Sequence, residues 1–339
     1  MHDLEVRVQS DLEQLTDSVD FSGVVGLSRN GGRFVELTSG LADRANGRPI
    51  RADTPFGTAS VTKGLTALTV ASLIESGQLS YDTTLRSLLP RDLPMVDPGV
   101  TIEHLLAHTS GVGDYLDEET LGDVDDYVMG LPVHRLATPA DYLPLLDGHP
   151  QRSAPGSRFA YNNGGYVMLS IAAEVAGGAS FYDLVRERVI DPAAMADTGF
   201  VRSDRLPPGA AIGYLADGRS NVLHLPVRGA GDGGAYSTLA DLEALWVSLF
   251  AGRIVPLPVV ERLVEARSNA DGKRGYGLGF WLRSDRATVM LEGMDAGVSC
   301  RTVYDRSTGF GYTVISNTSS GAWPIVRYLD EHLPMIAEG

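Results

Sequence analysis

Ser60 and Lys63 are the two residues of this chain whose types and spacing could do chemistry together. They stand near the start of the stretch 56–79, which is mostly apolar up to the helix stop signal Gly77. Residues three apart on a helix lie on one face, so the hydroxyl and the amine should meet. An amine in an apolar site near the positive end of a helix dipole has a lowered pKa, because desolvation and like-sign repulsion both disfavour the ammonium. A neutral amine could then accept the serine proton, which would make the serine a nucleophile.

A purely structural explanation of the same pair is also open. Ser60 could be a helix N-cap and Lys63 a solvated residue of the first turn. Composition favours the chemical interpretation, because only two of the 28 basic residues are lysine, Lys63 and Lys273. Arginine supplies the ordinary positive charge of this chain, yet arginine could not provide the removable proton that lysine offers at residue 63.

The elements that must position this pair are predicted by the spacing of apolar residues. Helical spacing occurs over residues 3–18, and the hairpin signal Asn30-Gly31-Gly32 joins two predicted strands. After a mainly helical middle, the period becomes two-fold again before a closing helix over 322–333. The predicted strands are 23–29, 33–41, 276–282, 288–291, 297–304 and 311–317.

Strands at both ends of the chain and helices between them predict an α+β fold. The two ends should form one antiparallel sheet, with the terminal helices covering it. We expect a single domain over residues 1–339, with a sheet subdomain at about 1–58 and 270–339 and an inserted, mainly helical subdomain at about 59–269. The cleft between the two subdomains is the expected ligand site.

The remaining polar signals are weaker. Residues 112–150 are acidic and weakly periodic, which is typical of a solvated loop or lid. His104 and His108 have a spacing that would suit a metal, but no carboxylate stands in register with them. We therefore expect no metal and no cofactor, and we expect His108 to brace its turn by a hydrogen bond.

Composition bounds the function. The net charge of −15 argues against nucleic acid or an anionic membrane as the partner. The single Cys300 allows no intrachain disulfide, and we expect a buried strand thiol there. The charged N-terminus does not look like a signal peptide, so the simplest prediction is a cytoplasmic protein, although a trimmed chain would look the same.

Several motifs in order resemble those of serine β-lactamases and penicillin-binding proteins. They are Ser60-x-x-Lys63, Tyr161-x-Asn163 and a glycine-bearing strand near the C-terminus. With LLAHTSGV at 105–112 and GGAYSTLADL at 233–242, the chain most resembles the class C β-lactamase-like group. That group includes esterases, D-aminopeptidases, D-Ala-D-Ala carboxypeptidases and transacylases. The resemblance implies a β-lactamase/transpeptidase-like fold over roughly residues 20–335.

The resemblance also implies a role for each matching residue. Ser60 would be the nucleophile and Lys63 its partner. Tyr161 would be the second half of the base, as a phenolate favoured by the lysine's charge, and would later protonate the leaving group. Asn163 would hydrogen-bond Lys63 or a substrate amide. A core tyrosine at residue 161, and a turn or cap residue at 163, are the structural alternatives.

The third motif departs from the family pattern. Members of the group carry Lys-Thr-Gly or His-x-Gly on the strand that lines the site, where this chain has the stretch 293–298. The best match places Asp295 at the basic position and Gly297 at the glycine, with the N–H groups of Val298 and Ser60 forming the oxyanion hole. The register could slip by one residue. A carboxylate at the basic position would repel a substrate carboxylate, so we expect weak or absent β-lactamase and carboxypeptidase activity.

The sequence therefore predicts a serine hydrolase that acts through an acyl-enzyme on Ser60. Its substrate would be a small ester or amide, uncharged or amine-bearing, as for an esterase or an amidase/D-aminopeptidase. A biosynthetic transacylase using the same site is one alternative. A non-catalytic ligand-binding homologue, with Asp295 as a sign of lost chemistry, is the other.

Overall fold

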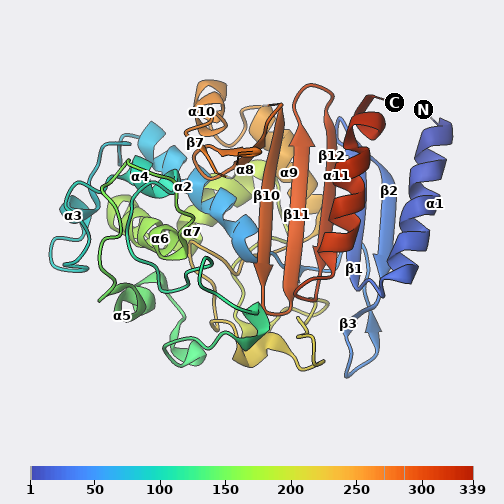
Figure 1. Ribbon diagram of the computed structural model, residues 1–339, viewed down its shortest axis with the longest axis horizontal. Coiled ribbons are helices and arrows are strands. Elements are labelled where there is room, and N and C mark those ends of the chain that lie inside the picture. Colours follow the sequence, from blue (N-terminus) through green and yellow to red (C-terminus); the bar gives the residue numbers. More distant parts are fainter. Residues whose placement is uncertain (1, 271, 286, 339) are drawn as a thin grey trace.

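An eight-stranded antiparallel sheet stands beside a mainly helical part in the computed structural model, which describes residues 2–270, 272–285 and 287–338 (Figure 1). The spatial order of the strands is β2-β1-β12-β11-β10-β9-β8-β7. Both chain ends therefore contribute to one sheet, which confirms the predicted α+β fold. The strands are β1 (Gly23–Arg29), β2 (Gly32–Ser39), β7 (Ser268–Asn269), β8 (Arg274–Tyr276), β9 (Trp281–Arg283), β10 (Thr288–Asp295), β11 (Val298–Asp305) and β12 (Phe310–Ser316).

The first hairpin has the turn that its sequence predicts. Arg29 pairs with Gly32 across the two-residue turn Asn30-Gly31, and both turn residues have positive φ, 50° and 79°. Asparagine and glycine tolerate this left-handed backbone better than other residues. The hairpin then presents β1 to β12, with Gly23 opposite Ser316, so the centre of the sheet joins the two ends of the chain.

Helices cover both faces of the sheet. The terminal helices α1 (His2–Ser18) and α11 (Ala322–Glu338) lie side by side over one face (Figure 1). Apolar side chains such as Val8 of α1 and Ile325 of α11 are buried there against the strands. On the other face, α9 (Leu239–Phe250) packs against β1 and β12. The sheet is thus the middle layer of three.

The predicted strand 276–282 is wrong in one respect, because the structure has two short strands there. β8 ends at Tyr276 and β9 begins at Trp281, and the two pair with each other. Gly279, between them, has φ of +97°, and a Cβ at this residue would lie 2.3 Å from the Cβ of Ala67. The close approach to α2 needs glycine, and it turns the chain back on itself.

The helical part is organised around α2 (Thr62–Glu75), which packs against α6 (Asn163–Gly177). Most residues of α2 are buried, as the apolar residues on nearly every side of the helix predict. The other helices are α3 (Leu85–Leu88), α4 (Ile102–Leu106), α5 (Leu143–Leu146), α7 (Phe181–Val185), α8 (Asp191–Ala193) and α10 (Leu257–Leu263). Residues 112–150 are mostly loops with short helical turns. The subdomain limits at about residues 58 and 270 stay a prediction.

Two-stranded ladders complete the fold and hold the approach to α2. They are formed by β3 (Leu41–Asp43) with β4 (Arg48–Pro49), and by β5 (Phe56–Gly57) with β6 (Tyr236–Ser237). In the described part of the chain no single helix has the length and hydropathy needed to cross a membrane. Among the described residues, the two segments 163–177 and 181–193 have the required length and hydropathy only when they are taken together, and they are bent by 85° relative to each other.

Candidate active site

Ser60 lies in a tight turn between the β5–β6 ladder and α2, and not in the first turn of α2 as the spacing predicted. The turn is a short 3-10 helix over Ala59–Val61, and α2 begins at Thr62. Ala59 has φ of +46°, a left-handed conformation that is strained for a residue with a side chain. Thr58 anchors the turn, because its N–H and its hydroxyl both donate to the carbonyl of Ala235 at 2.9 Å. Ser60, the middle residue of this turn, is partly exposed.

Lys63 is buried, with 2% of its surface exposed, and its amine reaches the serine. The Nζ atom lies 2.9 Å from Ser60 Oγ, 2.7 Å from Asn163 Oδ1 and 2.8 Å from the carbonyl oxygen of Asp232. These three partners are uncharged oxygens. Burial lowers the pKa of Lys63, while the carboxylates of Asp232 and Glu118 raise it in part.

Asn163 is brought to Lys63 by the start of α6. Asn162 caps this helix, its side chain accepting the N–H of Gly165 at 2.6 Å. The buried carboxylate of Asp114 accepts the N–H groups of Asn163 at 2.6 Å and Gly164 at 2.8 Å. Burial raises the pKa of Asp114 to about 6, although these hydrogen bonds act in the opposite direction. The helix N-terminus is thus fixed by its own N-cap and by a carboxylate from one other segment.

Tyr161 lies beside the same amine, half-buried among aromatic rings. Its ring centroid is 4.9 Å from Lys63 Nζ, 4.4 Å from the ring of His108 and 5.9 Å from the parallel ring of Trp281. Burial raises the pKa of Tyr161 well above 10, and the negative charge of Glu118 adds to this, while a hydrogen bond with Ser60 lowers it in part. The surroundings therefore favour the neutral phenol, and not the phenolate that the resemblance implied.

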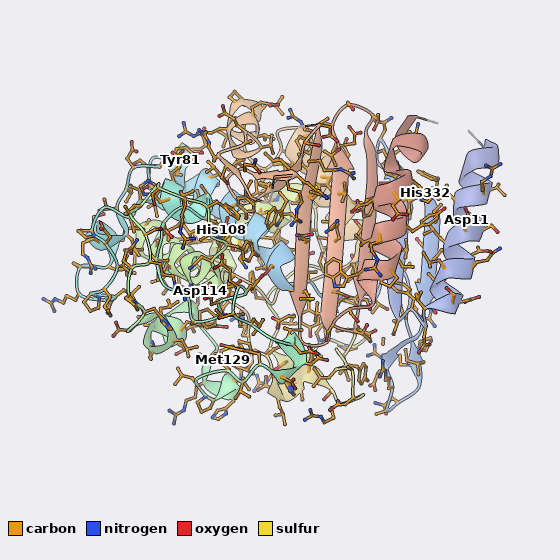
Figure 2. The ribbon with its side chains drawn as sticks, viewed as in Figure 1. Asp11, Tyr81, His108, Asp114, Met129 and His332 are labelled. Carbon is orange, nitrogen blue, oxygen red and sulfur yellow. The ribbon has the colours of Figure 1, made fainter. Side chains whose placement is uncertain are left out.

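His108 braces this segment. Its Nδ1 accepts the N–H of Asn162 at 3.1 Å, so the neutral ring carries its proton on Nε2. Burial lowers the pKa of His108 well below 6.5, and the charge of Lys63 adds to this. Figure 2 shows His108 and Asp114 in the helical part, beside the sheet. His104, by contrast, takes part in the N-terminal cap of α4, where its Nδ1 accepts the N–H of Thr101.

The strand beside Ser60 is β10, and its closest approach is made by Gly293. A Cβ at Gly293 would lie 2.5 Å from the backbone nitrogen of Ser60, so only glycine fits. Val298, by contrast, begins the next strand, β11, where it pairs with Asp295 and packs against Gly57. The structure thus brings Gly293 to the amide of Ser60, and the best match expected from the sequence, Gly297 with Val298, is four residues out of register.

Gly297 and Asp295 belong to the turn that joins β10 to β11. Gly297 has φ of +72° in this turn, and its N–H donates to Ser319 Oγ at 2.7 Å. Asp295 faces the cleft, and one of its carboxylate oxygens accepts the N–H of Ala296 at 2.9 Å. Burial raises the pKa of Asp295 to about 7, although the hydrogen bond from Ala296 opposes the shift and Asp232 adds to it.

Two cavities meet at Ser60. One, of about 90 Å³, is the carboxylate-lined cavity: Glu118, Asp232 and Asp295 line it. Its other walls include four tyrosines and several apolar side chains, namely Tyr115, Tyr127, Tyr142, Tyr236, Met129, Val222 and Leu225.

The other cavity, of about 580 Å³, is the tryptophan-lined cavity. Trp281 and Trp323 line it, together with Tyr161. Both cavities share a mouth formed by the residues they have in common, which are Ser60, Leu116, Glu118, Met294 and Asp295. A substrate held across this mouth would present one half to each cavity, with the reacting bond at Ser60.

Sequence reasoning missed Glu118 and Asp232. Both lie in loops, where the spacing of apolar residues does not predict which way a side chain points. Asp232 stands between glycines, and this isolated acid inside a glycine run is the one signal that could have drawn attention to it. It is buried, and it accepts the hydroxyl of Tyr115 at 2.5 Å.

The fold and this geometry define the class of the protein, which is that of the β-lactamase fold. A family profile described as Beta-lactamase matches residues 8–329, and the chain belongs to this family. The chain is 32% identical over 226 residues to penicillin-binding protein 4* of Bacillus subtilis, an alignment covering 65% of this chain and 48% of that protein. It is 34% identical over 227 residues to the esterase EstB of Burkholderia gladioli, covering 62% and 55%. The chain spans about half the length of these two relatives.

A solved structure is similar over nearly its whole length. The crystal structure of a penicillin-binding protein from Bacillus halodurans superposes with a TM-score of 0.88 at 32% identity, covering 94% of this chain and 99% of that chain. The β-lactamase/transpeptidase-like fold expected from the motifs is thereby confirmed.

Proposed function

We propose that this protein is a serine acyl hydrolase that forms an acyl-enzyme on Ser60, with Lys63 as the base. One observation carries the proposal. The buried amine of Lys63, whose hydrogen-bond partners are all uncharged, lies 2.9 Å from the hydroxyl of Ser60. Ser60 and Lys63, together with Tyr161 beside them, are also the residues that the sequence motifs select.

The contacts of Lys63 determine the direction of its lone pair. A neutral amine has two N–H donors and one lone pair. The carbonyl of Asp232 and Oδ1 of Asn163 can only accept, so they take the two donors. The lone pair is then directed at Ser60, whose hydroxyl donates to it. As Ser60 Oγ attacks the acyl carbon, its proton passes to Lys63.

The oxyanion hole follows from the position of Gly293, not from that of Val298. Asp295 and Val298 close the two-residue turn and so exchange hydrogen bonds, and pairs alternate along an antiparallel ladder. The next residue of β10, Met294, therefore directs its N–H away from β11 and toward the mouth of the cavities that it lines. We assign the N–H groups of Ser60 and Met294 to the oxyanion.

Tyr161 is placed to protonate the leaving group. Its environment keeps the phenol neutral, and the interaction with Ser60 that lowers its pKa in part puts the hydroxyl on the side of the nucleophile. The phenol gives its proton to the departing oxygen or nitrogen and is reprotonated by the Lys63 ammonium. Water then attacks the acyl carbon by the reverse path, which frees Ser60 and the acid.

The carboxylate-lined cavity favours an acyl group that bears an amine. Three carboxylates line it, and no lysine or arginine does so among the described residues. Once Lys63 is neutral, no lysine or arginine among the described residues of the cavity balances these carboxylates, and burial raises the pKa of Asp295 to about 7, with the charges of Asp232 and Glu118 adding to the rise. An ammonium on the acyl half would supply the missing positive charge, whereas a carboxylate there would be repelled.

A labelling experiment tests the chemistry and a substrate pair tests the specificity. Mass spectrometry should find a fluorophosphonate adduct on the wild type but not on Ser60→Ala. Alanine p-nitroanilide should be cleaved faster than its N-acetyl derivative, and a cephalosporin should turn over weakly. No adduct on the wild type would overturn the hydrolase; fast cephalosporin turnover would overturn the assignment of the cavity.

A further inference from the structure

Glu118 is an exposed carboxylate at the mouth of the site, and apart from the charge that it adds to the carboxylate-lined cavity it has no part in the motifs or in the steps proposed above. It lines both cavities. Its Oε1 accepts a hydrogen bond from Nδ2 of Asn163 at 3.1 Å, and the carbonyl of Leu116 accepts a second one at 3.0 Å. Residues 116 and 118 of the loop thus hold the amide nitrogen of the asparagine whose amide oxygen holds Lys63.

These contacts decide which end of the carboxamide faces Lys63. The two ends of an asparagine side chain have the same shape but opposite hydrogen-bonding character. A flipped Asn163 would present N–H donors to the amine, and the lone pair of Lys63 would then turn toward Asn163 instead of Ser60. The acceptors at Leu116 and Glu118 can pair only with Nδ2, so they exclude the flip.

We propose that Glu118 is a positioning residue, which holds the Asn163 carboxamide in the orientation that directs the lone pair of Lys63 at Ser60. The proposal rests on the hydrolase function proposed above. Glu118 touches no reacting atom in this role, and its effect reaches Ser60 through Asn163 and Lys63.

The loop that carries Glu118 is fixed at a second point. Asp125, seven residues further on, accepts the N–H of Ala216 at 2.8 Å and the hydroxyl of Ser319. Ser319 precedes α11, so the loop is tied to the sheet part of the molecule while Glu118 is tied to α6. The orientation of Asn163 is therefore coupled to the position of this loop across the cleft.

The charge of Glu118 has a second measurable effect, which is on the pKa of Lys63. Lys63 faces the carboxylates of Asp114, Asp232, Asp295 and Glu118, the phenols of Tyr161 and Tyr166, and the imidazole of His108. Glu118 raises the pKa of Lys63, so its neutralisation must lower that pKa. Because Glu118 is exposed, this lowering of the Lys63 pKa should be small and should shrink at high salt.

The test compares Glu118→Ala, Glu118→Gln and the control Glu119→Gln, whose side chain lines neither cavity. We expect Glu118→Ala to lower the alkaline plateau of kcat/KM about tenfold, the effect of one lost hydrogen bond to a charged group. Glutamine keeps an acceptor oxygen, so with p-nitrophenyl acetate, which brings no ammonium to the cavity, Glu118→Gln should lose less of the plateau than Glu118→Ala. Both variants should move the ascending limb of the pH profile to lower pH, and Glu119→Gln should change neither.

A double-mutant cycle checks that the effect passes through the asparagine. In an Asn163→Ala background, Glu118→Ala should cause no further loss of the plateau. A full loss there, or an equal loss of the plateau in Glu118→Gln and Glu118→Ala, would mean that the carboxylate acts on the substrate directly and would overturn the proposal.

A measurement without turnover separates this proposal from the hydrolase itself. The chain has only two lysines, so Lys273→Arg leaves Lys63 as the single lysine signal in an NMR spectrum of protein labelled at lysine Cε. We expect both Glu118 variants to lower the pH at which this signal titrates, and Glu118→Ala also to displace the signal itself. An unchanged Lys63 signal in both variants would overturn the proposal even if the wild type forms no acyl adduct.

Discussion

Removal of a single hydroxyl, in Tyr161→Phe, tests the division of labour between the phenol and the amine. The aromatic contacts with His108 and Trp281 and the approach of Lys63 to the ring do not involve the hydroxyl. The variant should therefore fold, with a free energy of unfolding within about 1 kcal/mol of the wild type, the usual contribution of one hydrogen bond. Tyr304→Phe, which alters a ring stacked on Phe250, is the control.

The magnitude depends on the leaving group. The environment favours the protonated phenol, so the task proposed for it is to give a proton, and a positioned general acid contributes about 10²–10⁴-fold. A p-nitrophenolate leaves without a proton, whereas an amine or an alkoxide does not. We expect kcat/KM for an amide or alkyl ester to fall about 10²–10⁴-fold and that for a p-nitrophenyl ester to fall less than about tenfold.

The assay measures kcat/KM of each enzyme for both substrates, at a pH above the pKa of Lys63, and compares the ratio of the two values. A common factor, such as partial misfolding, cancels in that ratio. Equal losses on both substrates would refute the role of Tyr161 as the acid and would point to a role in activating Ser60. No loss on either substrate would remove Tyr161 from the chemistry.

Three further substitutions test other parts of the site. Lys63→Arg should lower kcat/KM at least about 10³-fold in a folded protein, since arginine stays protonated; retained activity in a burst assay would exclude Lys63 as the base. Gly293→Ala should destabilise the fold by about 2 kcal/mol and slow fluorophosphonate labelling about 100-fold, because its Cβ would lie 2.5 Å from the nitrogen of Ser60. Gly199→Ala, with no atom within 4 Å of the new Cβ, should do neither. Asp295→Asn should stabilise the protein by about 2 kcal/mol more at about pH 8 than at about pH 4.5, after allowance for the partial exposure of the side chain. The reason is that the pKa of Asp295 is raised to about 7 in the folded protein, so the stability linked to its protonation is lost as the pH rises through that value. Equal gains in urea unfolding at both pH values would contradict this.

The pairs that are close in sequence were the most predictable part of the site. Ser60 and Lys63 are one helical turn apart, and local geometry alone brings them together. The sheet could be predicted as well, because two-fold periodicity at both chain ends leaves the ends no partner but each other. These inferences depend on contacts that the local chain dictates.

The register of β10 could not be predicted, because it depends on contacts between distant segments. Gly293 and Gly297 both fit a motif that asks for a glycine. Only the position of the Ser60 turn against the strand decides between them, through the collision that a Cβ at Gly293 would make. The same reasoning applies to the protonation state of Tyr161, which is set by rings and carboxylates that arrive from four other segments.

The place of β1 between β2 and β12 has a consequence for biosynthesis. A ribosome delivers the first hairpin long before the strand that must lie beside it, so the nascent chain carries an open edge that invites aggregation until β12 has been made. Such long-range pairing also slows folding. The late segment includes β10, so a truncated translation product could contain both Ser60 and Lys63 and still lack the backbone amide that completes the oxyanion hole. The proposed hydrolytic activity would then arise only after β10 has left the ribosome and paired.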